Sequence, residues 1–221
     1  MCATHPAPVD RVDWVQHLEQ TLENFDDVGG HRCLSMAFED LTLEDALTGV
    51  VLPYLKGVGD RWEAGTIGVG QEHFASNVIR SRLSSVMLTQ AREHGPLVVL
   101  ACMPKEHHEF GLMAAALAFS QLGWRTCYLG ANTPIADLVR ACGRLQPDAV
   151  MLSAHRPTAY AAHAPVLRHL ATSTPIYLGA RGASEALAAL CHATHLDMDP
   201  VTAAHLVQRG LKERVATSAT G

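Results

Sequence analysis

The spacing of apolar residues changes once along the chain, near Gly95, and this change limits the folds that the sequence can adopt. Before Gly95, apolar residues recur at steps of three and four, the period of an amphipathic helix, as for Val12, Val15, Leu18 and Leu22. After it, short apolar runs alternate with helical stretches. The sequence therefore predicts an all-α N-terminal part followed by an α/β part.

The N-terminal part, residues 9–94, is predicted to form a bundle of about four helices. After the first helix, helical periodicity continues in RCLSMAFEDL, TLEDALTGVVLPYLKGVGDRW and QEHFASNVIRSRLSSVMLTQAREH. Thr42, with Glu44 close behind, gives the third helix a start signal, and Pro53 predicts a kink or a break in it.

The C-terminal part, residues 96–213, contains five strand candidates: LVVLAC, RTCYLG, AVMLSA, PIYLG and, more weakly, THLD. Helical stretches separate them, one of them TAYAAHAPVLRHLA between the third and fourth strands. Such alternation predicts a doubly wound parallel sheet of the flavodoxin-like Rossmann type, with helices on both faces. Ligands of such domains bind at the carboxyl ends of the strands.

Charge and cysteine spacing exclude several classes of function. A formal net charge of -5 argues against direct binding to nucleic acid, which requires a basic face. The six cysteines form no CxxC pair, so we expect reduced thiols and neither a zinc site nor a disulfide framework. The N-terminus lacks the apolar core of a signal peptide, and no apolar stretch approaches the ~20 residues of a spanning helix. We therefore expect a cytoplasmic protein with no membrane partner.

The segment KEHHEFG, directly after the first strand candidate, contains Glu106-x-His108-x-x-Gly111. A magnesium-dependent receiver domain would need acidic residues at the end of this strand, where Cys102 and Met103 stand, and a flavin-phosphate loop would need Ser, Thr and Gly donors. A carboxylate two residues before a histidine can instead fix the tautomer of that histidine as a metal ligand. The glycine leaves room for an approaching group. The alternative is a pair of solvated histidines at a helix start.

This pattern, together with Ser153 in MLSAHRP and Gly179 in IYLGARG, resembles the signature of cobalamin-binding domains. The resemblance covers residues 96 to about 213. It implies that His108 replaces the dimethylbenzimidazole as the lower axial ligand of cobalt, the base-off, His-on mode, and that Glu106 orients it.

The same resemblance implies a path for the displaced nucleotide tail between the sheet and its helices, where Gly111 and Ser153 make room for it and contact it. The family often has two consecutive glycines at the end of the fourth strand. This chain has Gly179-Ala180 there, with Gly182 further on, and both glycines are expected near the cofactor.

A second motif lies in the helical part, where Trp62, nine residues and then Glu72-His73 resemble the CarH-type light sensors that use adenosylcobalamin. The resemblance implies a bundle that caps the upper face of the corrin, with Trp62 on the adenosyl group and Glu72 bonded to its ribose. His73 would become the upper cobalt ligand after photolysis. Trp62 should end one helix, terminated by Gly65, and Glu72 and His73 should lie in the first turn of the next. The alternative is that Trp62 belongs to the hydrophobic core, Glu72 complements the dipole of its helix and His73 faces solvent.

CarH-type repressors carry an N-terminal MerR-type DNA-binding domain, whereas about eight residues precede the first predicted helix of this chain. We therefore expect no direct contact with nucleic acid, and a homo-oligomer or a protein effector as the output.

In the stand-alone relatives called photocobilins a bilin is held beside cobalamin, which implies biliverdin as a second chromophore. His155, His163, Arg156 and Tyr160 would suit its propionates and pyrrole carbonyls. His155 and Arg156 also follow the third strand, at the ligand edge.

The sequence thus favours a light-sensing, non-enzymatic regulator in which photolysis of the cobalt–carbon bond of adenosylcobalamin alters domain packing or assembly. The enzyme-class alternative is a corrinoid methyl-carrier protein of a methyltransferase system, or a mutase-type cobalamin subunit, working in darkness with a catalytic partner. Methyl carriers also join a helical bundle to this domain, but are not expected to carry the Trp62, Glu72 and His73 set. A third reading is an antirepressor that binds a transcription factor.

Overall fold

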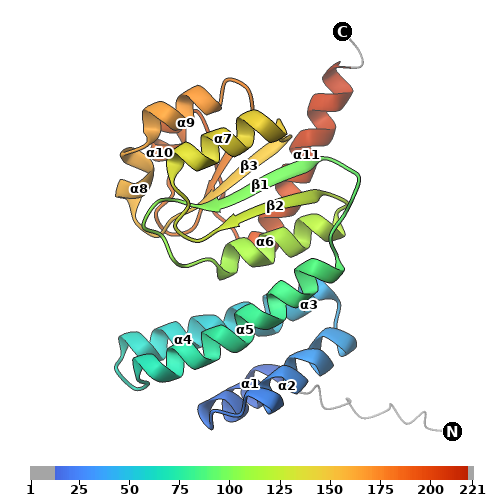
Figure 1. The fold of residues 1–221 in the computed structure, drawn as a ribbon, viewed down its shortest axis with the longest axis vertical. Helices are drawn as coiled ribbons and strands as arrows, with labels where there is room; N and C mark the ends of the chain where they lie inside the picture. Colours follow the sequence, from blue (N-terminus) through green and yellow to red (C-terminus); the bar gives the residue numbers. More distant parts are fainter. Residues whose placement is uncertain (1–12, 219–221) are drawn as a thin grey trace, which may run out of the picture. The chain divides into compact units, whose positions relative to one another are not determined.

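The computed structural model describes residues 13–218, and the chain divides into two compact units between Val78 and Ile79. The described residues of the first unit are helical, which confirms the predicted all-α N-terminal part (Figure 1). Val12, from the first predicted helix, lies outside the described residues. The helices are α1 (Trp14–Glu23), α2 (Asp27–Asp40), α3 (Leu43–Ala46), the π-helical η1 (Leu47–Val51), α4 (Leu52–Glu63) and the first half of α5 (Val69–Thr89).

Polar side chains cap the first three helices. Asp13, Asp26 and Thr42 each accept a hydrogen bond from the backbone N–H three residues ahead, which satisfies one of the donors that a helix start leaves unpaired. The start predicted at Thr42 is therefore confirmed. The core of this unit consists of large aliphatic side chains and a tyrosine, among them Leu18, Leu22, Leu34, Leu47, Val51 and Tyr54.

Pro53 does not break the helix in which it lies. The chain is helical from Leu43 to Glu63, and the turn before the proline is η1, where the backbone N–H of Leu52 donates to the carbonyl of Leu47. Proline has no N–H and its ring clashes with the carbonyl four residues earlier, so a wider π turn accommodates it. Of the predicted kink or break, the break is therefore wrong, and the backbone changes locally from α to π geometry before the proline.

The second unit contains a five-stranded parallel sheet in the order β2-β1-β3-β4-β5, which confirms the predicted flavodoxin-like arrangement. Its strand order changes direction between β1 and β3, so the loops that follow these two strands diverge and leave room for a ligand. All five predicted strands are present: β1 (Leu97–Cys102), β2 (Arg125–Gly130), β3 (Ala149–Ser153), β4 (Ile176–Gly179) and β5 (Thr194–His195).

Helices cover both faces of this sheet (Figure 1). On one face, α7 (Ile135–Leu145), α8 (Pro157–Ala161), α9 (Ala164–Leu170) and α10 (Glu185–Cys191) enclose a core that includes Val99, Leu152, Leu138, Tyr160 and Leu167. On the other face, α6 (Phe110–Gln121) packs against α11 (Pro200–Ser218). The single helix predicted between the third and fourth strands is two helices, α8 and α9, because Pro165 fits the first turn of a new helix better than a helix interior.

The division between the units falls inside α5, earlier than the predicted boundary near Gly95. The second half of α5 and the turn after it bond to the sheet unit: Arg80 Nε donates to Glu109 Oε1 (2.8 Å), and Arg92 Nε donates to the carbonyl of Ser120 (3.0 Å). The Arg80 guanidinium also lies 5.1 Å from the centre of the Phe110 ring. The domain limits 9–94 and 96–213 stay predictions.

The cysteines that the structure describes form no disulfide with one another: Cys33, Cys102, Cys127, Cys142 and Cys191. Cys2 lies outside the described residues. Burial raises the pKa of Cys102 to about 12, so this thiol stays protonated at neutral pH. In the part of the chain that the structure describes, every helix is too short or too polar to cross a membrane.

Candidate functional site

The loop after β1 is fixed by hydrogen bonds to neighbouring strand ends. The backbone N–H of Met103 donates to the carbonyl of Ser153 (2.9 Å), and that of Asn132 donates to the carbonyl of Glu106 (2.7 Å). Asn132 Oδ1 accepts the backbone N–H of Lys105 (2.7 Å), a residue held in the left-handed region at φ 68°. The loop is therefore shaped before any ligand arrives.

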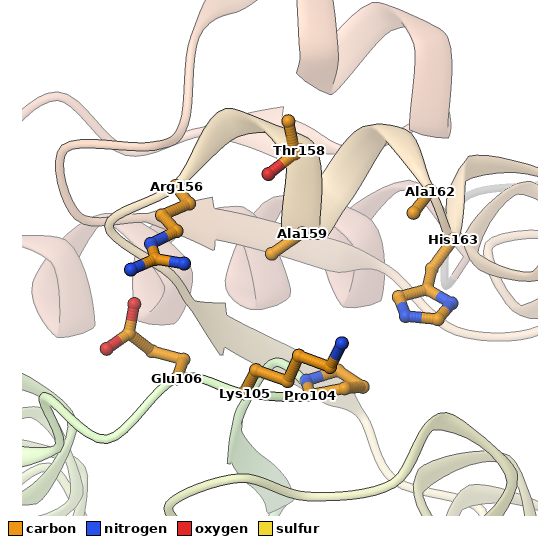
Figure 2. A pocket seen from close by; sticks show the side chains of 8 residues that line it. All are labelled: Pro104, Lys105, Glu106, Arg156, Thr158, Ala159, Ala162 and His163. Carbon is orange, nitrogen blue, oxygen red and sulfur yellow. The ribbon is translucent and has the colours of Figure 1, made fainter.

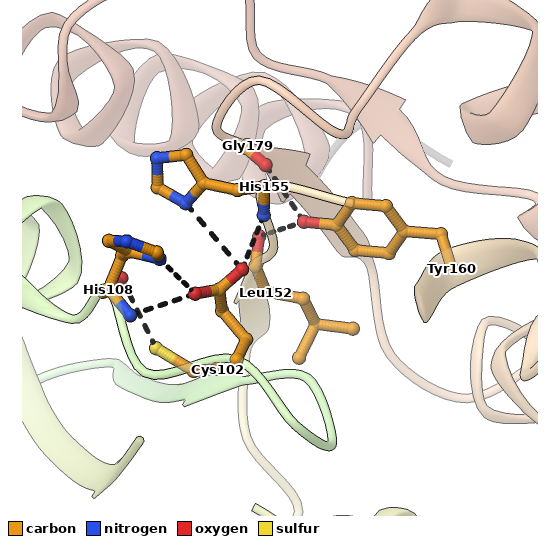
Figure 3. A network of polar contacts seen from close by, with 7 residues as sticks. Cys102, His108, Leu152, His155, Tyr160 and Gly179 are labelled. Carbon is orange, nitrogen blue, oxygen red and sulfur yellow. Dashed lines mark hydrogen bonds and ion pairs between the residues drawn. The ribbon is translucent and has the colours of Figure 1, made fainter. Parts of the chain in front are cut away.

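Glu106 is buried at the switch point of the sheet and forms a polar network with His108 and His155, which Figure 3 shows side by side. Its Oε1 accepts the backbone N–H of His108 (2.8 Å) and lies 2.6 Å from Nδ1 of the same residue. Its Oε2 accepts the backbone N–H of His155 (2.6 Å). Burial acts to raise the pKa of Glu106, but the hydrogen bonds from His108 and His155 outweigh it and lower the pKa to about 2. Glu106 is thus a carboxylate at neutral pH.

His108 is held at one side of its ring and open at the other. Because a carboxylate can only accept, the 2.6 Å contact with Glu106 places the proton of a neutral His108 on Nδ1. Nε2 then carries the lone pair, and the side chain is 73% exposed. This is the arrangement that a metal-ligating histidine needs, with one nitrogen oriented by a carboxylate and the other available.

His155 stands beside His108, on the loop after β3. The centres of the two rings are 4.3 Å apart, at an interplanar angle of 50°. Nδ1 of His155 is buried and lies 3.5 Å from Glu106 Oε2, too far for a hydrogen bond. Burial, followed by the nearby His108, lowers the pKa of His155. One carboxylate therefore brings together two imidazoles from two different loops.

Three predicted cofactor-binding residues line one cavity of about 120 Å³. They are Gly111 in α6, Ser153 at the end of β3 and Gly179 at the end of β4. A Cβ added at Gly111 would approach nothing closer than Pro200 Cγ, at 3.8 Å, and at Gly179 nothing closer than the Leu152 carbonyl, at 3.9 Å. The missing side chains therefore leave space in this cavity.

The end of β4 shows how the chain departs from a double glycine. Ala180 lines the same cavity with φ 64°, a conformation that favours glycine. Gly182 has another reason to be glycine, because its Cβ would lie 2.7 Å from both the Ala154 carbonyl oxygen and the Arg156 carbonyl carbon. It permits a close approach of two loops, and its predicted contact with the cofactor stays a prediction.

A larger cavity, of about 560 Å³, is lined by residues of the β1 loop and of the segment from Arg156 to His163 (Figure 2). Lys105, Arg156 and His163 bring cationic or titratable groups to it, and Thr158 brings a hydroxyl. The rest of the lining is Pro104, Glu106, Ala159 and Ala162. The opening therefore combines apolar surface with groups that suit an anion.

Tyr160 does not reach that cavity, which corrects the expectation that it contacts a bilin. Its side chain is fully buried, and its hydroxyl lies 2.8 Å from the carbonyl of Gly179 and 3.1 Å from that of Leu152 (Figure 3). The tyrosine hydroxyl donates to backbone carbonyls of β3 and β4 inside the core, so it is not available to bind a ligand.

In the helical unit, Trp62 lies near the end of α4 and Glu72 and His73 lie in the first turns of α5, as predicted. Gly65, at φ 69°, ends α4 by donating its N–H to the Trp62 carbonyl. Trp62 is 49% exposed and is therefore not a core residue. Glu72 accepts the hydroxyl of Ser76 (2.7 Å), and the His73 side chain is 69% exposed.

The turn that carries these residues is attached to the end of α1. Arg61, next to Trp62, forms an ion pair with Glu23 and a second with Glu19 (3.1 Å). Gln71, next to Glu72, donates its side-chain amide to the Glu23 carbonyl (3.4 Å). Glu23 therefore anchors both helix ends, while the side chains of Trp62 and His73 face solvent.

Two family models, each described as a B12 binding domain, match the chain over residues 14–86 and 96–189. These ranges include Trp62, Glu72 and His73 in the first match, and Glu106 and His108 in the second. The chain belongs to the B12-binding family.

Two curated proteins are similar to this B12-binding chain. It is 46% identical over 111 residues to the HTH-type transcriptional repressor CarH of Myxococcus xanthus, over 49% of this chain and 36% of the repressor. It is 36% identical over 163 residues to the HTH-type transcriptional repressor CarA of the same organism, over 72% of this chain and 55% of the repressor. The chain thus spans about half or less of the length of these relatives.

A solved structure shares the fold of the B12-binding chain. The monomethylamine corrinoid protein of Methanosarcina barkeri superposes with a TM-score of 0.69, covering 86% of this chain and 94% of that protein. The two are 16% identical, so the likeness concerns the fold.

The residues of this B12-binding chain fit a corrinoid on structural grounds. His108 offers an exposed nitrogen lone pair from a ring whose tautomer is fixed, and the neighbouring cavity is lined by glycines whose missing side chains leave space. Among the described residues of this site, His108 is therefore well arranged to ligate a metal ion.

Two residues that shape the site were missed from the sequence. Asn132, after β2, fixes the β1 loop through Lys105 and Glu106, and its position in a turn with φ 49° is one that asparagine tolerates. Glu109 accepts from Arg80 and from the hydroxyl of Tyr128 (2.7 Å) just before α6. Its long-range partners left no local pattern in the sequence.

Proposed function

We propose that this chain is a light-sensing regulator that binds adenosylcobalamin base-off, with His108 as the lower axial ligand. The observation that carries the proposal is the buried Glu106 carboxylate, which holds Nδ1 of His108 and leaves Nε2 open at the switch point. Membership of the B12-binding family and the similarity to two transcriptional repressors support it.

In this proposal the sheet unit acts as the holder of the cofactor. Glu106 keeps the proton on Nδ1, and its two backbone hydrogen bonds keep the loops after β1 and β3 in place. The cavity at Gly111, Ser153 and Gly179 would take the nucleotide tail. When bound, adenosylcobalamin supplies a cobalt–carbon bond that visible light breaks.

The helical unit would respond to the adenosyl group. Trp62 offers an exposed aromatic face that excludes water, and Glu72 offers a carboxylate that accepts from ribose hydroxyls. His73 offers an exposed imidazole as the upper ligand after illumination. Because a ligand shifts an equilibrium only by its different affinities for two states, loss of adenosyl contacts would change packing or assembly. We propose self-association or a protein effector as the output.

We further propose biliverdin as a second chromophore. Its two propionates would suit Lys105 and Arg156, which make no ion pair within the described residues, and the lining also offers His163 and Thr158. A volume of about 560 Å³ is in the range of organic-ligand pockets.

The test of the cobalamin proposal is an absorbance spectrum of the protein loaded with adenosylcobalamin in darkness, before and after green light, with size-exclusion chromatography of both states. We expect a light-dependent change faster than that of the free cofactor, and a change of oligomer size or of partner binding. His108→Ala should alter the spectrum of the bound corrin, and the adjacent exposed His107→Ala is the matched control.

Other outcomes distinguish the alternatives. A bound corrin with no light response specific to the protein would contradict the sensor and favour a methyl carrier.

For biliverdin, we expect a red absorbance band that weakens in Lys105→Ala and Arg156→Ala but not in Arg168→Ala, an exposed control outside the cavity. Equal bands in all variants would contradict this site for the bilin.

A further inference from the structure

Glu106, His108 and His155 form a cluster of three donor side chains whose ligand atoms all lie within 4.8 Å of one another. We propose that in the absence of cobalamin this cluster binds a divalent first-row transition metal ion, with Zn²⁺ as the probe. The site shares His108 with the proposed function, but metal binding does not require that cobalamin binds.

The donor types select the kind of ion. Two imidazoles and one carboxylate match the open, three-residue zinc sites in which a water occupies the fourth position. Mg²⁺ and Ca²⁺ prefer oxygen donors, so two imidazoles disfavour them.

The distances suit a tetrahedral ion after a small adjustment. Donors bound at 2.0–2.1 Å around such an ion lie roughly 3.3 Å apart. His155 Nδ1 is 3.5 Å from Glu106 Oε2, close to that spacing. His108 Nδ1 is hydrogen-bonded to Oε1 at 2.6 Å, so the ion would take the place of the Nδ1 proton, Nε2 would carry the proton of the neutral ring instead, and the contact with Oε1 would open. The His108 side chain is 73% exposed, so its ring has space to turn.

Two features of the surroundings favour an ion over an empty cluster. The backbone N–H groups of His108 and His155 already orient the Glu106 carboxylate, the role that outer hydrogen bonds play around metal ligands. Nδ1 of His155 is buried with no hydrogen-bond partner in the part of the chain that the structure describes. A metal ion would satisfy this nitrogen, which otherwise carries the cost of an unpaired buried polar atom.

The shared histidine has a consequence for loading. An ion on Nδ1 of His108 holds the ring in the cluster and leaves the proton on Nε2, the nitrogen that the corrin needs. Zinc and cobalamin should therefore compete, and the metal-free protein should take up cobalamin faster than the zinc-bound protein.

The experiment is a calorimetric titration of ZnCl₂ into the full chain, freed of metal by EDTA and dialysis. We expect one site per chain, with affinity at least tenfold weaker in His108→Ala and in His155→Ala, since each removes one of three ligands. His107→Ala, next to the cluster but outside it, should bind as the parent does. Circular dichroism of each variant checks that it is folded.

A second measurement separates this proposal from the proposed function. Excess Zn²⁺ should slow the uptake of hydroxocobalamin by the parent protein, and EDTA should restore it. Zinc affinity unchanged in the His108→Ala, His155→Ala double variant would overturn the metal site. Cobalamin uptake that does not change with Zn²⁺ would also contradict the metal site, but would leave the cobalamin proposal intact. Zinc binding without any cobalamin uptake would contradict the cobalamin proposal and leave the metal site intact.

Discussion

The loops after β1 and β3 differ sharply from the turn between α4 and α5, although each carries half of the proposed cofactor contacts. In the sheet unit, Glu106 is 5% exposed and accepts hydrogen bonds from the loops after β1 and β3, and its contact with Nδ1 orients the His108 ring although that side chain is exposed. In the helical unit, Trp62 is 49% exposed and the His73 side chain 69% exposed. The first region is preorganised for a ligand, and the second would become ordered by one, at a cost in side-chain entropy.

This difference predicts a division of labour. Preorganised groups contribute affinity because little freedom is lost when the ligand binds. Exposed groups that become ordered only around the adenosyl moiety are suited to report its presence or loss. Substitutions in the sheet unit should therefore change cofactor affinity most, and substitutions in the helical unit should change the light response.

The largest effect is expected for His108→Ala, which removes the proposed cobalt ligand. Cobalamin affinity should fall more than about 100-fold, beyond the range for residues that only orient a ligand. Equilibrium dialysis against hydroxocobalamin measures it, with His107→Ala as the neighbouring control. A loss of less than tenfold would show that the preorganised histidine is not what holds the corrin.

Glu106→Gln should come next, because the amide keeps the shape but cannot accept at both oxygens. We expect a loss of cobalamin affinity of about 10–100-fold, measured by the same dialysis. His108→Ala and Glu106→Gln should also be far from additive when combined, since both act through one ring. Additive losses would mean that Glu106 acts by another route.

The same carboxylate should determine how stability depends on acid. The pKa of Glu106 is lowered from 4.5 to about 2 in the folded protein, so its stabilising effect is full above pH 4.5 and is lost as pH falls toward 2. Urea unfolding of the cofactor-free protein between pH 7 and pH 3 should show this loss in the parent and a shallower one in Glu106→Gln. Equal slopes would contradict the low pKa.

Trp62→Ala should leave stability nearly unchanged, within about 0.5 kcal/mol, because the side chain is half exposed. The lifetime of the adenosylcobalamin-bound form in darkness should shorten, and absorbance recorded over time at a fixed temperature measures it. Trp124, fully buried, is the contrasting site, where the same change should cost about 3–5 kcal/mol. A destabilised Trp62→Ala with an unchanged dark lifetime would make Trp62 structural and would remove the distinction between the two regions.

The smallest effect is expected for Ala180→Gly. Relief of the left-handed conformation at φ 64° should raise the free energy of unfolding by up to about 1 kcal/mol. Ala189→Gly, at an exposed position inside α10, should lower it by about 0.5–1 kcal/mol. Matched urea titrations at neutral pH compare the two variants, and a loss in both would mean that Ala180 is not strained.

The fold could be predicted from the sequence because its signals are local. The run LVVLAC and the helical spacing of Leu18 and Leu22 depend on neighbouring residues, and both were interpreted correctly. The π geometry of the helix before Pro53 and the division of the chain inside α5 were not predicted. The first depends on a π turn and the second on contacts between Arg80 and Glu109, and neither leaves a periodic pattern.

The site could be predicted only in part, for a similar reason. Glu106 and His108 are two residues apart, so their contact follows from spacing. The bond from the His155 backbone to Glu106 joins residues 49 positions apart, and only the strand order of the sheet brings them together. The burial of Tyr160 was missed because the sequence does not tell which side of a short helix faces the core.

The bond between Glu106 and residue 155 also affects how freely the site can vary among related chains. Position 155 supplies its main-chain N–H at 2.6 Å, a group that every amino acid except proline possesses. The hydrogen bond that joins the two loops would therefore survive almost any substitution at position 155. As a consequence, the side chain at this position can change while the loops keep their conformation. Descendants of such a protein could acquire new ligand preferences at this position while Glu106 stays fixed.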